Sequence, residues 1–134
     1  MNVNNNKTTN LDIIIKLSKT NNFDLGKQLD IKTYIPFGEK VKLIEGFMKD
    51  IFSNTSQLGK YNSLEKYLKF NMLVFKTYTN LQLEGTSEEY DKLLQSGLLD
   101  AIFTMIKEDY FDFKDLMDMR FEDYIRAEYT KINN

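Results

Sequence analysis

The chain has 134 residues, 20 acidic against 18 basic side chains, and neither histidine nor cysteine. The absence of both residues excludes the usual ligands of zinc, a thiol nucleophile and the one side chain that titrates near neutrality without perturbation. The length suits one domain, and ten Phe with eight Tyr supply the large side chains that a single buried core needs.

The N-terminal part gives the weakest structural signal. Residues 1–10 are polar and rich in Asn, so we expect a mobile leader that precedes a single helical domain over 11–134. The apolar run 11–17 is too short for its periodicity to separate strand from helix, although three consecutive isoleucines favour a strand. Apolar side chains then alternate over 29–35, which is typical of a half-buried strand. Together these patterns predict a small β-hairpin within residues 11–35.

The middle of the chain predicts two long helices. Apolar residues recur at spacings of three and four over 37–53, which indicates an amphipathic helix. After a loop over 53–61, Asn62 and Glu65 have the spacing of a capping box. They open a second helix that runs to about Leu81 and is apolar on nearly every side, as expected for the central helix of a bundle.

The last third predicts three more helices. Thr86 with Glu89 forms a second capping box, and Gly97 closes that helix as a left-handed cap. A short helix follows to about Ile106, after which acidic residues at 108–109 suit the start of a last helix over 110–130. That helix carries an apolar stripe at every fourth position: Phe113, Met117, Phe121 and Ile125. The fold class predicted is therefore mainly α, a single-domain bundle of four to five helices with a small N-terminal hairpin.

Charge is divided unevenly along the chain. Residues 1–83 hold twelve Lys and seven acidic residues, a balance of +5, whereas residues 84–134 hold six basic and thirteen acidic residues, a balance of −7. The last helix carries the densest acidic group: Asp112, Asp115, Asp118, Glu122 and Asp123. We interpret this group as a docking face for a basic protein, or for the lysine-rich face of an identical neighbour. The lysines of that face are Lys40, Lys42 and Lys49.

Such a self-contact favours head-to-tail assembly into a ring or filament. The alternative interpretation is a solvated helix face that keeps the chain in solution.

No residues indicate a catalytic, cofactor or metal site. The acidic residues of the last helix lack the alternating ligands and central glycine of a calcium loop, and the six glycines are too scattered for a phosphate-binding loop. The serines have no histidine partner. We therefore expect a non-enzymatic protein that binds no cofactor and no metal.

Nucleic acid and membrane fit the composition poorly as partners. Lys60, Lys66, Lys69 and Lys76 form a local basic group, but the net charge is −2 and only two Arg are present. In the same stretch, we predict that Tyr67 and Phe70 are core residues and that Asn71 is a buried, hydrogen-bonded amide. No stretch has the length and apolar character of a membrane span or signal peptide, so the expected location is the cytoplasm.

Three segments carry a resemblance to known proteins: Lys32-Thr-Tyr-Ile-Pro-Phe-Gly-Glu-Lys40, Tyr78-Thr-Asn-Leu81 and Tyr90-Asp-Lys-Leu-Leu-Gln-Ser-Gly-Leu-Leu-Asp-Ala-Ile102. In this order they resemble small helical proteins encoded by phages and prophages of low-GC Gram-positive hosts. The residue usage agrees, because abundant Asn, Lys and Ile are what an AT-rich coding sequence gives. The resemblance covers residues 30–106 and carries over no functional residue one by one.

The resemblance implies a role in particle structure or assembly. We therefore expect a non-enzymatic phage structural or assembly protein, either a head-tail or tail component or an assembly factor, which acts through protein–protein contacts. It would be found in the host cytoplasm or incorporated into a virion. The alternative is a small phage-encoded regulator or inhibitor that binds a host protein through its acidic C-terminal helix.

Overall fold

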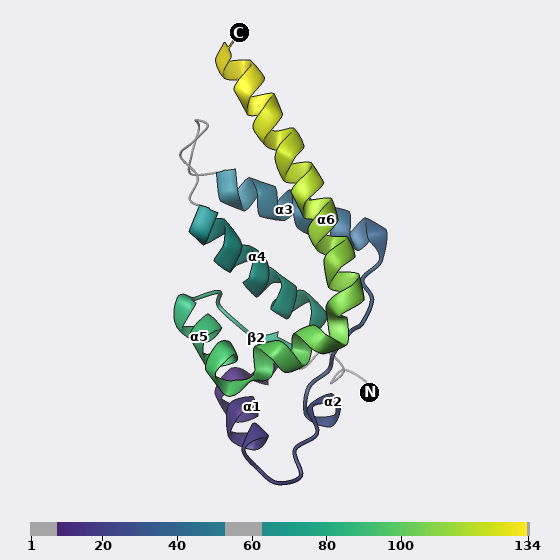
Figure 1. Ribbon diagram of the computed structural model, residues 1–134, viewed down its shortest axis with the longest axis vertical. Helices are drawn as coiled ribbons and strands as arrows, with labels where there is room; N and C mark the ends of the chain where they lie inside the picture. Colours follow the sequence, from purple (N-terminus) through teal and green to yellow (C-terminus); the bar gives the residue numbers. More distant parts are fainter. Residues whose placement is uncertain (1–7, 53–62, 134) are drawn as a thin grey trace.

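The computed structural model describes residues 8–52 and 63–133. This part is mainly helical, which confirms the predicted fold class. Its elements, in chain order, are β1 (Thr9–Asn10), α1 (Leu11–Ser18), α2 (Leu25–Gln28), α3 (Phe37–Phe52), α4 (Ser63–Tyr78), β2 (Leu81–Gln82), α5 (Ser87–Ser96) and α6 (Leu98–Asn133). α6 contacts both α3 and α5, and its last turns project beyond the other helices (Figure 1).

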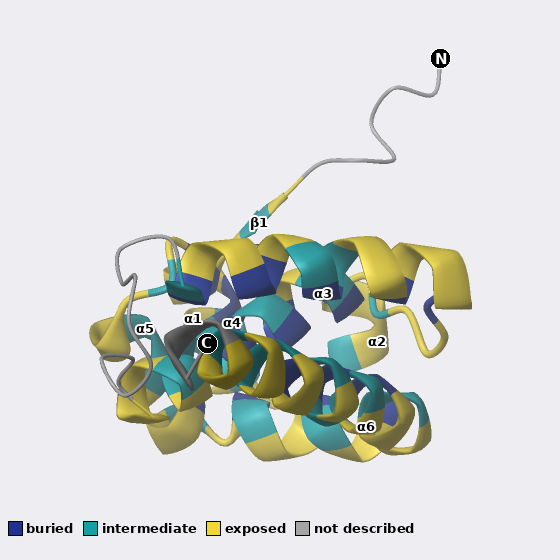
Figure 2. Ribbon diagram, turned by 90° about the horizontal axis from the view of Figure 1, so that it is seen from above, coloured by how far each residue is buried: buried dark blue, intermediate teal, exposed yellow. Residues whose placement is uncertain are grey.

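One cluster of buried apolar side chains lies between the helices. In α3 the buried apolar residues recur at the predicted spacing of three and four: Ile44, Phe47, Met48 and Ile51. In α6 the predicted stripe also faces the core, because Phe113, Met117 and Phe121 are buried and Ile125 packs against them. Figure 2 shows the exposed residues of α3 and α6 on the outward sides of the two helices.

The hairpin predicted within residues 11–35 is wrong. Residues 11–18 form α1 because the side chain of Asn10 accepts hydrogen bonds from the amides of Asp12 and Ile13 and so caps a helix. This cap, together with burial of one face of α1, outweighs the strand preference of the three isoleucines.

The segment that follows α4 supplies the strand pairing that the hairpin was expected to give. β1 and β2 form a parallel pair, and Ile31 makes an isolated antiparallel bridge to Thr79. Asn80 joins the two sides: its side chain accepts from the Asp30 amide at 3.0 Å and donates to the Thr9 hydroxyl at 3.0 Å. Local alternation could not reveal these pairings, because the partners lie about fifty or more residues apart in sequence.

The predicted leader over 1–10 needs a correction at its end. Residues 9–10 form β1 and cap α1, so they belong to the folded part of the chain. Residues 1–7 lie outside the described residues, as do the predicted loop over 53–61 and Asn62 of the first capping box.

Two helix boundaries differ from the prediction. α4 ends at Tyr78 rather than near residue 81, because the next residues pair with β1 and with Ile31. The two helices predicted after Gly97 are one continuous helix, α6, since neither glycine nor proline interrupts residues 98–133. The capping box of Thr86 with Glu89 and the left-handed Gly97, at φ 81°, are confirmed.

Replacing Phe113 should show how far the core depends on α6. Phe113 is fully buried, with its ring centroid 5.4 Å from that of Phe70 and 6.2 Å from that of Tyr78. We expect Phe113→Ala to lower the free energy of unfolding by about 3–5 kcal/mol, measured by urea titration, because it leaves a cavity. Phe111→Ala, at a position that is 46% exposed, should cost about 1 kcal/mol or less. Equal losses for the two variants would contradict this packing.

Candidate partner-binding site

The acidic residues predicted on the last helix lie on α6 and differ in exposure. Asp112, Asp115, Glu122 and Asp123 are exposed, whereas Asp118 is half-buried. Met119 lies between them and is 64% exposed, so this face presents one apolar side chain among its carboxylates. Residues 115, 119, 122 and 123 share one face because they are spaced by three and four positions. We call Asp115, Met119, Glu122 and Asp123 the α6 ridge.

Several of these carboxylates have partners within the chain. Asp118 pairs with Lys114 at 2.8 Å, and Glu122 and Asp123 both approach Arg126, at 3.4 and 3.6 Å. The side chains of these pairs are between 43% and 77% exposed, so each pair contributes little to stability and exchanges easily for another partner. Asp115 makes no ion pair within 8–52 and 63–133. The α6 ridge is therefore acidic but less negative than the sequence alone indicates.

The expectation that Lys40 belongs to an exposed basic face is wrong. Its side chain is 2% exposed, and its ammonium group donates to Asp109 at 3.0 Å and to Asp112 at 2.7 Å. The Asp109 carboxylate is 10% exposed and also accepts from the Tyr78 hydroxyl at 2.6 Å and the Ile35 amide at 2.9 Å. We call these residues the Lys40 cluster: Ile35, Lys40, Tyr78, Asp109 and Asp112.

Hydrogen bonds keep the buried groups of the Lys40 cluster charged. Burial raises the pKa of Asp109, but hydrogen bonds from Tyr78, Lys40 and the Ile35 amide outweigh burial and hold this pKa below its usual value. Burial lowers the pKa of Lys40, and its hydrogen bonds to Asp112 and Asp109 outweigh that effect, so the pKa is raised. Burial and the neighbouring Asp109 raise the pKa of Tyr78, which therefore stays a neutral donor.

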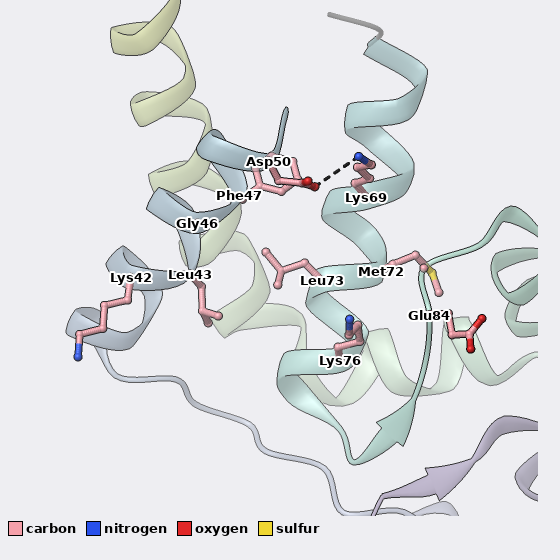
Figure 3. A pocket seen from close by; sticks show the side chains of 11 residues that line it. Lys42, Leu43, Gly46, Phe47, Asp50, Lys69, Met72, Leu73, Lys76 and Glu84 are labelled. Atoms are coloured by element: carbon pink, nitrogen blue, oxygen red, sulfur yellow. Dashed lines mark ion pairs between the residues drawn. The ribbon is translucent and has the colours of Figure 1, made fainter. Parts of the chain in front are cut away.

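The other two predicted lysines remain at the surface of α3. Lys49 lies beside Glu45, whose pKa is lowered mainly by a hydrogen bond from Arg120. Lys42 lies at the outer end of a groove of about 390 Å³ between α3 and α4, with its amine directed away from the floor (Figure 3). We define the α3–α4 groove by its lining residues: Lys42, Leu43, Gly46, Phe47, Asp50, Lys69, Met72, Leu73, Lys76, Glu84 and Gly85.

The α3–α4 groove has an apolar floor and a charged rim. Leu43 from α3 and Leu73 from α4 approach one another across the floor (Figure 3). The rim carries three lysines and two carboxylates, of which Asp50 pairs with Lys69 at 3.4 Å. Lys42 and Lys76 make no ion pair in the part of the chain that the structure covers. An apolar floor inside a polar rim is the composition of a protein-binding surface.

Gly46 opens the groove on the α3 side. It lies inside a helix, where glycine is about 0.8–1 kcal/mol less favourable than alanine. A Cβ atom added to Gly46 would meet nothing within 4 Å, so no contact of the described chain requires a glycine here. The missing side chain leaves room for another backbone to approach α3 closely.

The basic group predicted around residues 60–76 does not gather on one face. Lys69 and Lys76 line the α3–α4 groove, but the Lys66 ammonium lies 3.9 Å from the centre of the Phe121 ring on α6. Lys60 lies outside the described residues. The spacing of seven residues between Lys69 and Lys76 is the sequence signal that places them on one helix face.

The predictions for the centre of α4 are confirmed in part. Phe70 is buried, and the half-buried Asn71 forms a hydrogen bond with Tyr90 of α5, as expected for a satisfied amide. Tyr67 is 61% exposed, so its assignment to the core is wrong. Its ring stands edge-on to the ring of Tyr90. The pKa of Tyr90 is raised to about 12, mainly by burial and to a smaller extent by the hydrogen bond to Tyr67.

The described residues give no further chemical site of the kinds considered. Within them, no group of three or more carboxylates is placed to hold a metal ion. Among the helices that the structure describes, none combines the length and apolar character required to cross a bilayer. No family model, curated protein or solved structure matches the chain. The resemblance to phage proteins therefore stays a prediction.

Replacing Asp109 should strongly destabilise the protein and change its response to acid. Asp109→Asn leaves Lys40 buried beside one remaining carboxylate, and we expect a loss of about 3 kcal/mol in urea titrations at pH 7. The lowered pKa of Asp109 stabilises the folded state above the unfolded pKa of about 4, and this contribution is lost as the pH falls through the folded pKa. Unfolding free energies of the variant should therefore fall less steeply with acidification than those of the unsubstituted protein.

Asp115→Asn provides the matched control for this effect. Asp115 lies on the same helix but is exposed and makes no ion pair in the covered ranges, so its loss should change stability by about 0.5 kcal/mol or less. An Asp109→Asn variant as stable as this control at pH 7 would show that the Lys40 cluster does not support the fold.

Proposed function

We propose that this protein is a non-enzymatic interaction module whose α3–α4 groove binds an acidic, amphipathic helix of a partner during the assembly of a larger particle. The observation that carries the proposal is the apolar floor of the groove beneath a lysine rim, with Gly46 at its opening. Helices that dock in grooves insert an apolar stripe and place charged residues along the edges. A stripe flanked by Glu or Asp would match Lys42 and Lys76, which have no ion-pair partner within the described ranges.

The particle is proposed from the resemblance to phage proteins. In that setting the protein is a structural or assembly component that works through surface complementarity, in the host cytoplasm or in a virion. The alternative is a regulator that binds a host protein through acidic residues, and it is favoured by the exposed carboxylates and Met119 of the α6 ridge. The two proposals differ in the surface they need, since the regulator has no use for the α3–α4 groove.

A synthetic helix tests the proposed groove directly. The probe is an eighteen-residue peptide (about five helical turns) with Leu and Met on one stripe and Glu on both flanks. The control peptide has the same composition in an order that scatters the apolar residues around the helix. We expect only the first peptide to shift the NMR signals of the Gly46 amide and the Met72 methyl group, because both residues line the groove.

Gly46→Ala should separate stability from binding. The added methyl group meets no atom within 4 Å in the free chain, so the free energy of unfolding should rise by about 0.5–1 kcal/mol. The same methyl group stands where the partner helix approaches. We expect this steric overlap to cost about 1.4 kcal/mol of binding free energy, so that the peptide binds roughly tenfold more weakly. Thermal unfolding and peptide titration measure the two effects. Unchanged peptide affinity in the stabilised variant would contradict the proposed docking site.

A further inference from the structure

We propose that the helix received by the α3–α4 groove is the α6 ridge of a second copy of this chain. This inference rests on the function proposed above and names the partner. The α6 ridge offers one apolar side chain flanked by acidic residues: Met119 is 64% exposed and stands between Asp115 and Glu122 at spacings of four and three residues. Met119 would enter over Gly46 onto the apolar floor, and the ridge carboxylates would lie against Lys42 and Lys76.

Charge complementarity favours the α6 ridge as the partner of the α3–α4 groove. The ridge carries three carboxylates, of which Asp115 makes no ion pair in the described part and two share the exposed Arg126. The rim of the groove has one positive charge in excess, with three lysines against two acids, and Asp50 already pairs with Lys69. Carboxylates that approach Lys42 and Lys76 therefore bind to lysines without first breaking an existing ion pair.

The contact is heterologous, because the groove is built by α3 and α4 whereas the ridge belongs to α6. After two copies pair, one copy keeps an unused ridge and the other keeps an unused groove. Repeating the contact therefore produces a closed ring or an open filament rather than a symmetric dimer. Because exposed charges contribute, the assembly should weaken as salt rises.

A pair of charge-reversed variants tests the self-contact. In one variant, Lys42→Glu and Lys76→Glu make the rim acidic; in the other, Asp115→Lys and Glu122→Lys make the ridge basic. We expect the unsubstituted protein to form assemblies in sedimentation velocity runs at 50 mM salt, and we expect each variant alone to sediment as a monomer. Mixing the two variants should restore assembly, because the acidic groove of one accepts the basic ridge of the other.

Controls distinguish this inference from the proposed function. Lys19→Glu with Lys27→Glu changes the same charge at exposed positions on other elements and should leave assembly intact. Circular dichroism of every variant checks that the helices remain folded. If the unsubstituted protein stays monomeric at millimolar concentration while the acidic peptide still binds the groove, the partner is not a second copy and only this inference fails. Failure of the mixed variants to associate would also overturn it, whereas a groove that ignores the peptide overturns the proposed function itself.

Discussion

The buried ion pair between Lys40 and Asp109 is the constraint on which the arrangement of the helices depends. Asp109 accepts from Lys40 on α3, from Tyr78 at the end of α4 and from the Ile35 amide, so one carboxylate on α6 holds three separate segments. Such a pair adds little net stability over an apolar pair of similar size. It does restrict how the helices can be arranged, because any other alignment of α3 and α6 would leave a buried charge unpaired. It also fixes the rotation of α3. Because successive residues turn by about 100°, a helix with Lys40 directed at α6 turns Lys42 and Gly46 away from α6, on the side that borders the groove.

The parts of the fold that local chemistry determines could be predicted from the sequence. Repeating apolar residues located α3, and the capping box of Thr86 with Glu89 and the left-handed Gly97 located both ends of α5. Predictions failed where distant segments decide the structure. Residues 29–35 alternate like a strand, but their one bridge is made to Thr79, after α4. The acidic residues at 108–109 resemble a helix start, yet Asp109 serves as the acceptor for groups from three other segments, and α6 continues past it.

The candidate site was only partly visible in the sequence. Lys42 and four of the five acidic residues predicted on the last helix are exposed, because charged residues opposite an apolar stripe face the solvent, whereas Asp118 is half-buried. Lys40 was misassigned although a signal existed: it precedes Ile44 by four positions and so belongs to the buried stripe of α3. Lys69 and Lys76 were grouped by composition instead of by helix face. The role of Gly46 could not be predicted from the sequence, because a missing side chain opens a groove only if another helix lies beside that position.

The absence of cysteine from the chain allows the most direct test of the proposed contact. Gly46→Cys and Met119→Cys each introduce a single thiol, and a disulfide between them requires the two Cα atoms to approach within about 7 Å. After the variants are mixed and oxidised gently, we expect a disulfide-linked pair of one copy of each, identified by mass spectrometry. Gly46→Cys mixed with Lys19→Cys serves as the background. A yield from the first mixture no higher than this background would contradict the docking of the α6 ridge in the α3–α4 groove.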